Sequence, residues 1–197
     1  MKSTTTFSVG SLLLVATLVS CAPENKTATT ADSVFAARPA AASVADANSL
    51  DIIFLGSFRG IAPGDKMAVH EANLVKSELV TGEGDFTVYL IMDEPEGKIG
   101  YLMPDPDDET KVGDITITSS IPTTTEGMKV GMTLGDLFNR YRNLEIHGSE
   151  IGGRTTAYKG QLSFRIDANN YEYEIDPEKI PLNAKITEIS INRSPEK

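Results

Sequence analysis

Hydrophobic and polar residues alternate along much of the second half of the chain, which is the pattern of β-strands with one buried face. Residues 162–167 alternate in this way, and so do residues 171–175 and 114–118. The last such segment, 184–191, changes its period between its isoleucines, which predicts a β-bulge near Thr187-Glu188. These segments predict a sheet built from antiparallel strands.

A first hairpin is predicted before that region. Phe86–Met92 is apolar on both faces, which is typical of a central strand, and Asp93–Gly97 provides a turn. The returning strand, 98–103, alternates so that three side chains are expected on one face: Ile99, Tyr101 and Met103.

Four further segments carry weaker patterns. Residues 144–151 and 155–158 flank Gly152-Gly153, which predicts a hairpin with a two-residue turn. The apolar run 50–55 fits either a buried strand or a short helix, and 67–75 is equally ambiguous.

One amphipathic helix is predicted at 133–142. Thr133 is a good N-cap, and Asp136 three residues later completes a capping-box pattern. The apolar stripe behind this cap recurs at helical spacing and contains Leu134, Leu137, Phe138 and Tyr141. Arg140 and Arg142 complement the carboxyl end of the helix dipole, with anion binding as the alternative interpretation. A helix this short needs a partner surface, so the predicted fold is α+β, with the helix packed on a mainly antiparallel sheet.

The N-terminal residues predict a signal peptide followed by a lipidation site. Lys2 precedes an apolar run, Leu12–Val19, that is too short to span a bilayer. The run ends in Leu18-Val19-Ser20-Cys21, which resembles the lipobox of bacterial lipoproteins. That resemblance implies a signal peptide at 1–20, cleavage before Cys21, and attachment there of diacylglycerol and a further acyl chain such as palmitate. Ala22 in place of an aspartate implies the outer membrane.

The remaining chain is expected to form a tether and one domain. Residues 21–49 are rich in Ala, Thr, Ser and Pro and carry no sustained apolar period, which predicts a flexible tether. Residues 50–193 form a single α+β domain, and 194–197 form a tail. Cys21 is the sole cysteine, so no disulfide and no thiolate metal site is expected. The net charge of −10, made more negative by loss of Lys2, argues against a nucleic-acid partner.

The order of these elements is similar to that of the sigma-E-regulated envelope lipoproteins, a family of unknown function. The resemblance runs from Asp85 to Arg193, and its sharpest part is Ile121–Leu137. The Gly152-Gly153 hairpin departs from the pattern. The resemblance supports a lipid-anchored envelope protein and supplies no catalytic residue.

Several polar clusters could carry chemistry, but each has a simpler structural interpretation. His147, Ser149 and Glu150 hold the residue types of a hydrolase without its nucleophile elbow. His70 and Glu71 with His147 lack metal-ligand spacing. Four carboxylates could bind calcium weakly, although their loop lacks the EF-hand glycine: Asp105, Asp107, Asp108 and Glu109. Gly152-Gly153-Arg154 fits a turn better than a phosphate cradle. We therefore predict no catalytic residue, no metal site and no cofactor.

Tyrosine and arginine side chains offer a possible binding face, which consists of Tyr141, Arg142, Tyr158 and Arg165. The tyrosines could equally be core residues with hydrated hydroxyls.

The sequence favours a non-enzymatic envelope lipoprotein that binds or assembles with a partner. The anchor at Cys21 would hold it on the membrane, and the partner would be an envelope protein, a lipid or a cell-wall component. One alternative is an envelope hydrolase that uses carboxylates such as Glu145 and Glu150. Another is a carrier of apolar ligands, which predicts a cavity between helix and sheet.

Overall fold

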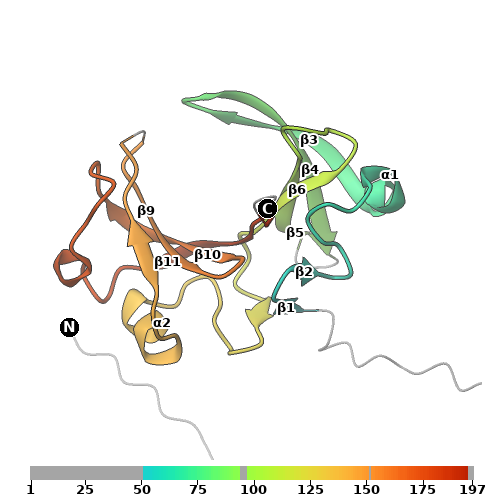
Figure 1. The fold of residues 1–197 in the computed structure, drawn as a ribbon. Helices are drawn as coiled ribbons and strands as arrows, with labels where there is room; N and C mark the ends of the chain where they lie inside the picture. The colour runs from blue at the N-terminus through green and yellow to red at the C-terminus, as the bar shows by residue number, and fades with distance from the viewer. Residues whose placement is uncertain (1–50, 94–96, 151, 195–197) are drawn as a thin grey trace, which may run out of the picture. The chain divides into compact units, whose positions relative to one another are not determined.

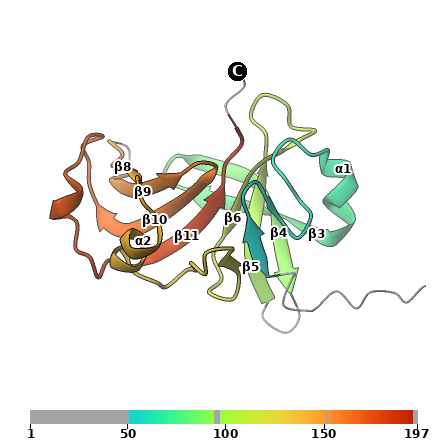
Figure 2. The ribbon, with the colours of Figure 1, turned by 60° about the horizontal axis from the view of Figure 1, so that its bottom comes forward.

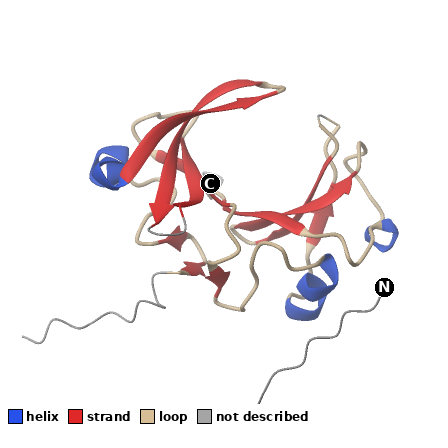
Figure 3. Cartoon of the chain, turned by 180° about the vertical axis from the view of Figure 1, so that it is seen from behind, coloured by secondary structure: helices blue, strands red, loops and turns tan. Residues whose placement is uncertain are grey.

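The computed structural model describes residues 51–93, 97–150 and 152–194, all within the unit that spans 43–197. Antiparallel strands are the main regular structure of these residues, and the helices are few and short (Figure 3). The prediction of a mainly antiparallel sheet is confirmed. The strands are β1 (Ile52–Phe54), β2 (Ser57–Phe58), β3 (Leu74–Thr81), β4 (Gly84–Asp93), β5 (Gly97–Pro104), β6 (Val112–Ile117), β7 (Thr123–Thr124), β8 (Glu145–His147), β9 (Arg154–Lys159), β10 (Leu162–Asn169) and β11 (Ile186–Ile191). The helices are α1 (Met67–His70), the 3-10 turn η2 (Glu71–Asn73), α2 (Leu134–Arg140) and the 3-10 turn η3 (Pro177–Lys179).

Eight strands form one sheet in the order β3-β4-β5-β6-β11-β10-β9-β8. Strands β3 to β6 form a meander, and β8 to β10 form a second one. The last strand, β11, joins the two by pairing with β6 on one side and β10 on the other (Figures 1 and 2). A small second sheet, β2-β1-β7, contains the parallel pair β1–β7.

The predicted first hairpin is confirmed, but its faces are not as expected. Strand β4 pairs with β3 and β5, so it is an interior strand although it lies next to the edge. The register between β4 and β5 shifts at Ile91/Met92, which leaves Ile99 as an extra residue. The shift reverses the alternation that follows. Ile99 and Leu102 are therefore fully buried, whereas Tyr101 lies on the opposite face from Leu102.

The bulge predicted near Thr187-Glu188 is confirmed. Arg165 pairs with Glu188, and Ile166 pairs with Ile186, which leaves Thr187 as the extra residue of β11. The bulge keeps isoleucines on the buried face at both ends of the strand.

The prediction of a strand at 171–175 is wrong. This segment is irregular and makes only one bridge to the sheet, His147 to Glu174. A strand inside a sheet has two edges, and those of β10 are occupied by β9 and β11. The alternating segment therefore finds no place beside β10.

The predicted hairpin around Gly152-Gly153 exists with a longer connection. Strand β8 ends at His147 and β9 begins at Arg154, so the turn is wider than two residues. Both glycines have positive φ, 75° and 60°, which explains why glycine is suited to these positions. The ambiguous segment 67–75 contains α1 and η2 before β3 begins at Leu74, and the run 50–55 contains β1.

Helix α2 begins as predicted and ends earlier. Thr133 Oγ1 accepts a hydrogen bond from the Asp136 backbone N–H (3.1 Å), and Asp136 Oδ2 accepts one from the Thr133 N–H (2.9 Å). The predicted capping box is therefore confirmed. The helix ends at Arg140 because Tyr141 is extended, so Arg142 lies outside it. Within the predicted stripe Leu134 and Leu137 are fully buried, but Phe138 is 38% exposed.

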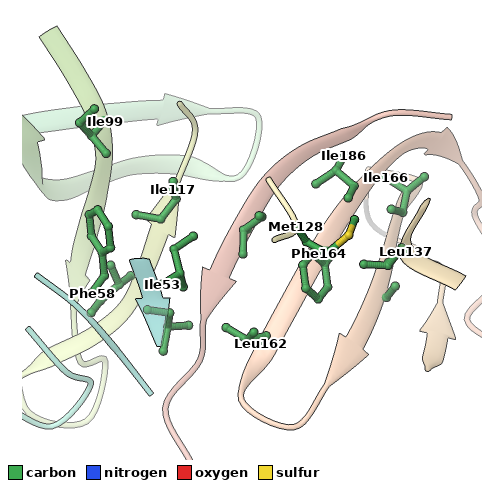
Figure 4. Packing of buried hydrophobic residues seen from close by; sticks show 14 of the residues in the cluster. Ile53, Phe58, Ile99, Ile117, Met128, Leu137, Leu162, Phe164, Ile166 and Ile186 are labelled. Atoms are coloured by element: carbon green, nitrogen blue, oxygen red, sulfur yellow. The ribbon is translucent and has the colours of Figure 1, made fainter. Parts of the chain in front are cut away.

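One hydrophobic cluster runs along the buried face of the large sheet (Figure 4). Its first part gathers side chains from β1, β2, β5 and β6: Ile53, Phe58, Ile99 and Ile117. Its second part gathers Met128, Leu137, Leu162, Phe164, Ile166 and Ile186. This buried face leaves the opposite side of the sheet for polar residues.

The predicted signal peptide, Cys21 and the tether 21–49 lie outside the described residues, as do residues 195–197 of the tail. None of the helices in the described part of the chain has the length and apolar content needed to cross a bilayer.

Candidate functional site

The face of the large sheet opposite the core carries hydroxyl and charged side chains. Across the central strands Tyr101 stands beside Thr116, Thr116 beside Ser190, and Ser190 beside Ser163. Arg165 and Glu188 follow on the same face two residues further along their strands. We call these six residues the polar face.

Hydrogen bonds and an ion pair link neighbours on the polar face. Thr116 Oγ1 lies 3.0 Å from Ser190 Oγ, and Arg165 Nη1 lies 3.3 Å from Glu188 Oε1. Burial raises the pKa of Tyr101, and the negative charge of Glu188 raises it further, while a hydrogen bond with Thr116 opposes both effects. Tyr101 is therefore a neutral hydroxyl at physiological pH, suited to donating or accepting a hydrogen bond.

An ion pair shows that the sheet curves around this face. Glu83, in the turn between β3 and β4, lies 3.6 Å from Arg154 of β9. Strands β5, β6, β11 and β10 separate β4 from β9 in the sheet. Figure 1 shows the tip of the β3–β4 hairpin reaching toward β9. The polar face is therefore concave, and Arg154 and Arg165 line a pocket of about 250 Å³ on it.

A larger groove of about 810 Å³ lies beside the polar face. Its walls include Phe86 and Tyr89 of β4, Lys76 of β3, the loop that follows β5, and Asn192 after β11. Asn192 Oδ1 accepts a hydrogen bond from Ser163 Oγ (3.3 Å), so the groove and the polar face are adjacent. The groove combines aromatic rings with charged groups, which suits a ligand that presents both apolar and polar groups.

Arg193 closes one wall of this groove by binding residues 105–109 between β5 and β6, which we call the acidic loop. Its guanidinium contacts Asp105 Oδ1 (2.7 Å) and Asp107 Oδ2 (2.6 Å), and its backbone N–H donates to Asp114 Oδ1 (2.9 Å). The N–H of Asp107 and then Arg193 lower the pKa of Asp105, although desolvation opposes them. Two of the carboxylates proposed as calcium ligands are therefore paired with a cation of the chain.

The third carboxylate of that loop is also paired. Asp108 accepts hydrogen bonds from Thr110 and lies 3.2 Å from Lys111 Nζ. Across residues 51–93, 97–150 and 152–194, no group of three or more His, Cys, Asp or Glu side chains has the arrangement of a metal site.

The structure does not bring the predicted Tyr–Arg binding face together. Tyr141 is 7% exposed, and its ring lies 5.6 Å from that of Phe164, on the buried face of the sheet. Arg165 follows Phe164 in β10 and therefore lies on the opposite face, with Tyr158. Arg142 lies beyond α2 and is exposed. Of the four residues, only Tyr158 and Arg165 share a surface.

His147 has the surroundings of a packed side chain. Its ring stacks on Tyr173 at 4.5 Å and lies 6.0 Å from Tyr158. Its Nδ1 is buried and has no hydrogen-bond partner in the described part of the chain. A catalytic base needs a third group that orients it, so this geometry gives no support to a triad with Ser149 and Glu150. Glu145 and Glu150 are exposed.

The other histidine is paired with an aspartate. His70 Nε2 lies 3.0 Å from Asp65 Oδ2, within the loop before α1. His70 and His147 therefore occupy separate local environments.

Sequence reasoning missed the residues that matter most to this site. The alternation of β5 predicts Tyr101 on the same face as Ile99, whereas the structure places it on the polar face, and no sequence pattern indicates Arg193. Arg193 and Asp105 are 88 positions apart, so no local pattern connects them. The acidic composition of 105–109 was the one available signal for a cationic partner.

No known protein-family model matches the chain, and no curated protein matches it. Among solved structures, the uncharacterized protein yfeY from Escherichia coli is similar with a TM-score of 0.47 and 14% identity. The similarity covers 72% of this chain and 99% of that chain.

Proposed function

We propose that this chain is a lipid-anchored protein of the bacterial envelope, held at the outer membrane through Cys21. The observation that carries the proposal is Leu18-Val19-Ser20-Cys21 at the end of a short apolar run, with the sole cysteine of the chain at the cleavage point. Two or more acyl chains on this residue would anchor it stably, since each buried methylene contributes about 0.8 kcal/mol. On the residues Ile121–Leu137, we also propose membership of the sigma-E-regulated envelope lipoproteins.

We infer further that the domain is a non-enzymatic binding or assembly module, whose partner docks on the polar face. The concave surface, its linked hydroxyls and its neutral tyrosine support this proposal. The partner would be an envelope protein or a lipid headgroup that offers hydrogen-bonding groups to Tyr101 and Arg165. Neither carboxylate of the hydrolase alternative, Glu145 or Glu150, lines the groove or the pocket. The groove is also lined by charged residues such as Asp85 and Asp114, which does not favour an apolar carrier.

The proposed module relies on α2 packed against the far side of the sheet. Burial of Leu134 and Leu137 in the same cluster as Phe164 supports this packing, as does the ring contact of Tyr141. Two backbone hydrogen bonds tie the start of the helix and the turn before it to β11 and its preceding loop: Leu134 N to Ala184 O (2.9 Å) and Gly131 N to Ile186 O (2.8 Å). In this arrangement the helix stiffens the strands that carry the polar face.

Substitution of the anchor residue tests the localisation. We expect Cys21→Ala to abolish incorporation of labelled palmitate and to release the chain from the membrane fraction. Ser20→Ala is the matched control, because it changes the adjacent position yet keeps a small residue before the cysteine. A Cys21→Ala chain that still fractionates with membranes would refute the proposal.

Site-directed photocrosslinking in the native envelope tests the binding face. Tyr158 and Phe138 are almost equally exposed, at 37% and 38%, but Tyr158 lies on the side of the polar face and Phe138 lies on α2. A photoreactive phenylalanine at position 158 should yield a discrete adduct, and the same group at 138 should not. Equal labelling from both positions would indicate random encounter and would contradict the proposed site.

A further inference from the structure

Strand β3 forms one end of the large sheet, and no strand among the described residues pairs with its outer edge. It runs for 8 residues, Leu74–Thr81, and its pairing with β4 is free of register shifts. It contains no proline and no bulge, which are common devices that protect an edge strand from pairing with another chain. Val75 and Val80 on this strand are 51% and 73% exposed. The edge is therefore long, regular and partly apolar.

The backbone groups on this edge are available for hydrogen bonding. Thr81 and Gly84 face each other across the turn, and hydrogen-bonded pairs alternate along an antiparallel ladder from there. Residues 75, 77, 79 and 81 therefore bond to β4, and residues 74, 76, 78 and 80 direct their N–H and C=O groups outward. In the described part of the chain these outward groups of Lys76, Glu78 and Val80 have no hydrogen-bond partner.

The sequence of β3 is complementary to itself when it is read in the opposite direction. Around Ser77 the strand reads Leu-Val-Lys-Ser-Glu-Leu-Val. An antiparallel copy centred on Ser77 places Lys76 opposite Glu78, Val75 opposite Leu79, and Leu74 opposite Val80. Each pair joins opposite charges or two apolar side chains, and such pairs stabilise a sheet.

The same register satisfies the backbone. The Lys76–Glu78 pair can exchange two hydrogen bonds, because the backbone groups of both residues point outward. The Leu74 N–H already donates to Glu71 O, so the Leu74–Val80 pair can form one, from the Val80 N–H to Leu74 O. A slip by two residues would place Glu78 opposite Glu78 of the second copy, and like charges directly opposite are destabilising. Charge pattern, apolar pattern and hydrogen-bonding phase therefore agree on a single register.

We propose that β3 is a homodimer interface, in which two copies of this chain pair edge to edge, antiparallel, about Ser77. The two eight-stranded sheets then become continuous across a two-fold axis, with the same surface used by both copies. Lys76 also lines the groove beside the polar face, so Glu78 of the second copy borders that groove. The inference does not depend on the anchor or on the partner proposed above.

Disulfide trapping in the full-length chain tests the register directly. Ser77 faces its own copy across the axis in a non-hydrogen-bonded pair, where Cα atoms are about 4.5 Å apart, within the range of a disulfide. Val75 lies on the same face and is more exposed, but its copies are offset by about 14 Å along the strands. Under mild oxidation in the native envelope, we expect Ser77→Cys to form a covalent dimer at least about tenfold faster than Val75→Cys.

The wild-type chain, whose sole cysteine is Cys21, measures the background in this assay. Equal rates for the two variants would overturn the proposed register. A Ser77→Cys adduct that contains a different protein and no homodimer would overturn the choice of a second copy as the occupant of the edge.

Charge exchange provides an independent test that needs no crosslink. Lys76→Glu places two acidic residues opposite each other in both symmetric pairs, and Glu78→Lys places two basic ones. Each single variant should weaken dimerisation of the detergent-solubilised chain by at least about tenfold, measured by sedimentation at low salt. The double variant, Lys76→Glu with Glu78→Lys, restores the pairing and should return to within about threefold of wild type. A double variant that is as weak as the single ones would overturn the proposal.

Discussion

The hydroxyl of Tyr141 provides a direct test of whether this residue belongs to the core. It donates a hydrogen bond to Glu126 Oε2 (2.8 Å) and lies 3.1 Å from Thr124 Oγ1, while its ring packs 5.6 Å from Phe164. Tyr141→Phe keeps the ring and removes only the hydroxyl. Thr124 keeps one partner, because its Oγ1 also accepts from the Met128 N–H (3.1 Å). The variant therefore loses about one hydrogen bond to a charged group that is partly hydrated, which is worth about 1–1.5 kcal/mol of unfolding free energy.

Urea denaturation followed by far-ultraviolet circular dichroism measures this loss. A decrease of that size corresponds to about 3–5 °C in Tm for a domain of this length. The matched control is Tyr158→Phe, because Tyr158 is 37% exposed and should change the unfolding free energy by less than about 0.5 kcal/mol. If both variants changed stability equally, or if Tyr141→Phe abolished partner binding at unchanged stability, then Tyr141 would belong to a binding surface and the assignment to the core would be wrong.

The free energy of unfolding measured above pH 10 should also depend on the Tyr141 hydroxyl. Burial, together with the hydrogen bond and the negative charge of Glu126, raises the pKa of Tyr141 to about 12, although the hydrogen bond with Thr124 opposes this shift. The folded state thus holds the proton more tightly than the unfolded chain, whose tyrosine has a pKa of about 10. Its contribution is complete below pH 10 and is lost as the pH rises toward 12. We expect the stability difference between wild type and Tyr141→Phe to shrink across this interval, and a constant difference would contradict the assigned environment.

Two other substitutions probe the sheet and the groove. Gly100→Ala would place a Cβ 2.2 Å from the Thr116 carbonyl oxygen, so it should cost at least about 2 kcal/mol of unfolding free energy in urea, whereas Gly82→Ala, with open space around it, should be nearly neutral. Similar losses from both would refute the close approach of β5 and β6. Arg193→Gln removes the cation from the acidic loop, so the pKa of Asp105 should rise toward its ordinary value in a carboxyl NMR titration. A depressed pKa contributes stability that is lost as the pH falls through the folded value, so acid unfolding of Arg193→Gln should begin at a higher pH. An unchanged Asp105 titration would show that the contact with Arg193 is unimportant.

Local patterns predicted the elements whose hydrogen bonds are local. Thr133 and Asp136 are three residues apart, and the capping box they form needs nothing from the rest of the fold. The bulge at Thr187 was visible because the isoleucines of β11 must stay on one face. The two partners of the capping box lie within one turn of the chain, and the isoleucines that reveal the bulge lie within one strand.

The sequence did not predict which face of the sheet a side chain occupies where that face depends on the register between two strands. The register shift at Ile99 depends on how β5 pairs with β4, and it places Tyr101 on the polar face instead of the face of Ile99, where the alternation predicts it. Residues 171–175 alternate as a strand does, but both edges of β10 are paired with other strands, β9 and β11. Alternation of hydrophobic and polar residues indicates that a segment can pair as a strand, but it does not indicate whether the sheet has a free edge for it.

The sequence by itself determined the strand-rich class, the cap and start of α2, the bulge in β11 and the pattern around Cys21 that predicts an anchor. The self-complementary pattern of β3 was also present in the sequence, but only the topology showed that this strand lies at an edge. The tertiary structure alone decided that β11 joins the two meanders, that Tyr141 and Arg165 lie on opposite faces, and that Arg193 binds Asp105. The physical reason is that hydrogen bonds within a turn or a helix depend on a few adjacent residues. The pairing of distant strands instead depends on the burial gained by the whole sheet.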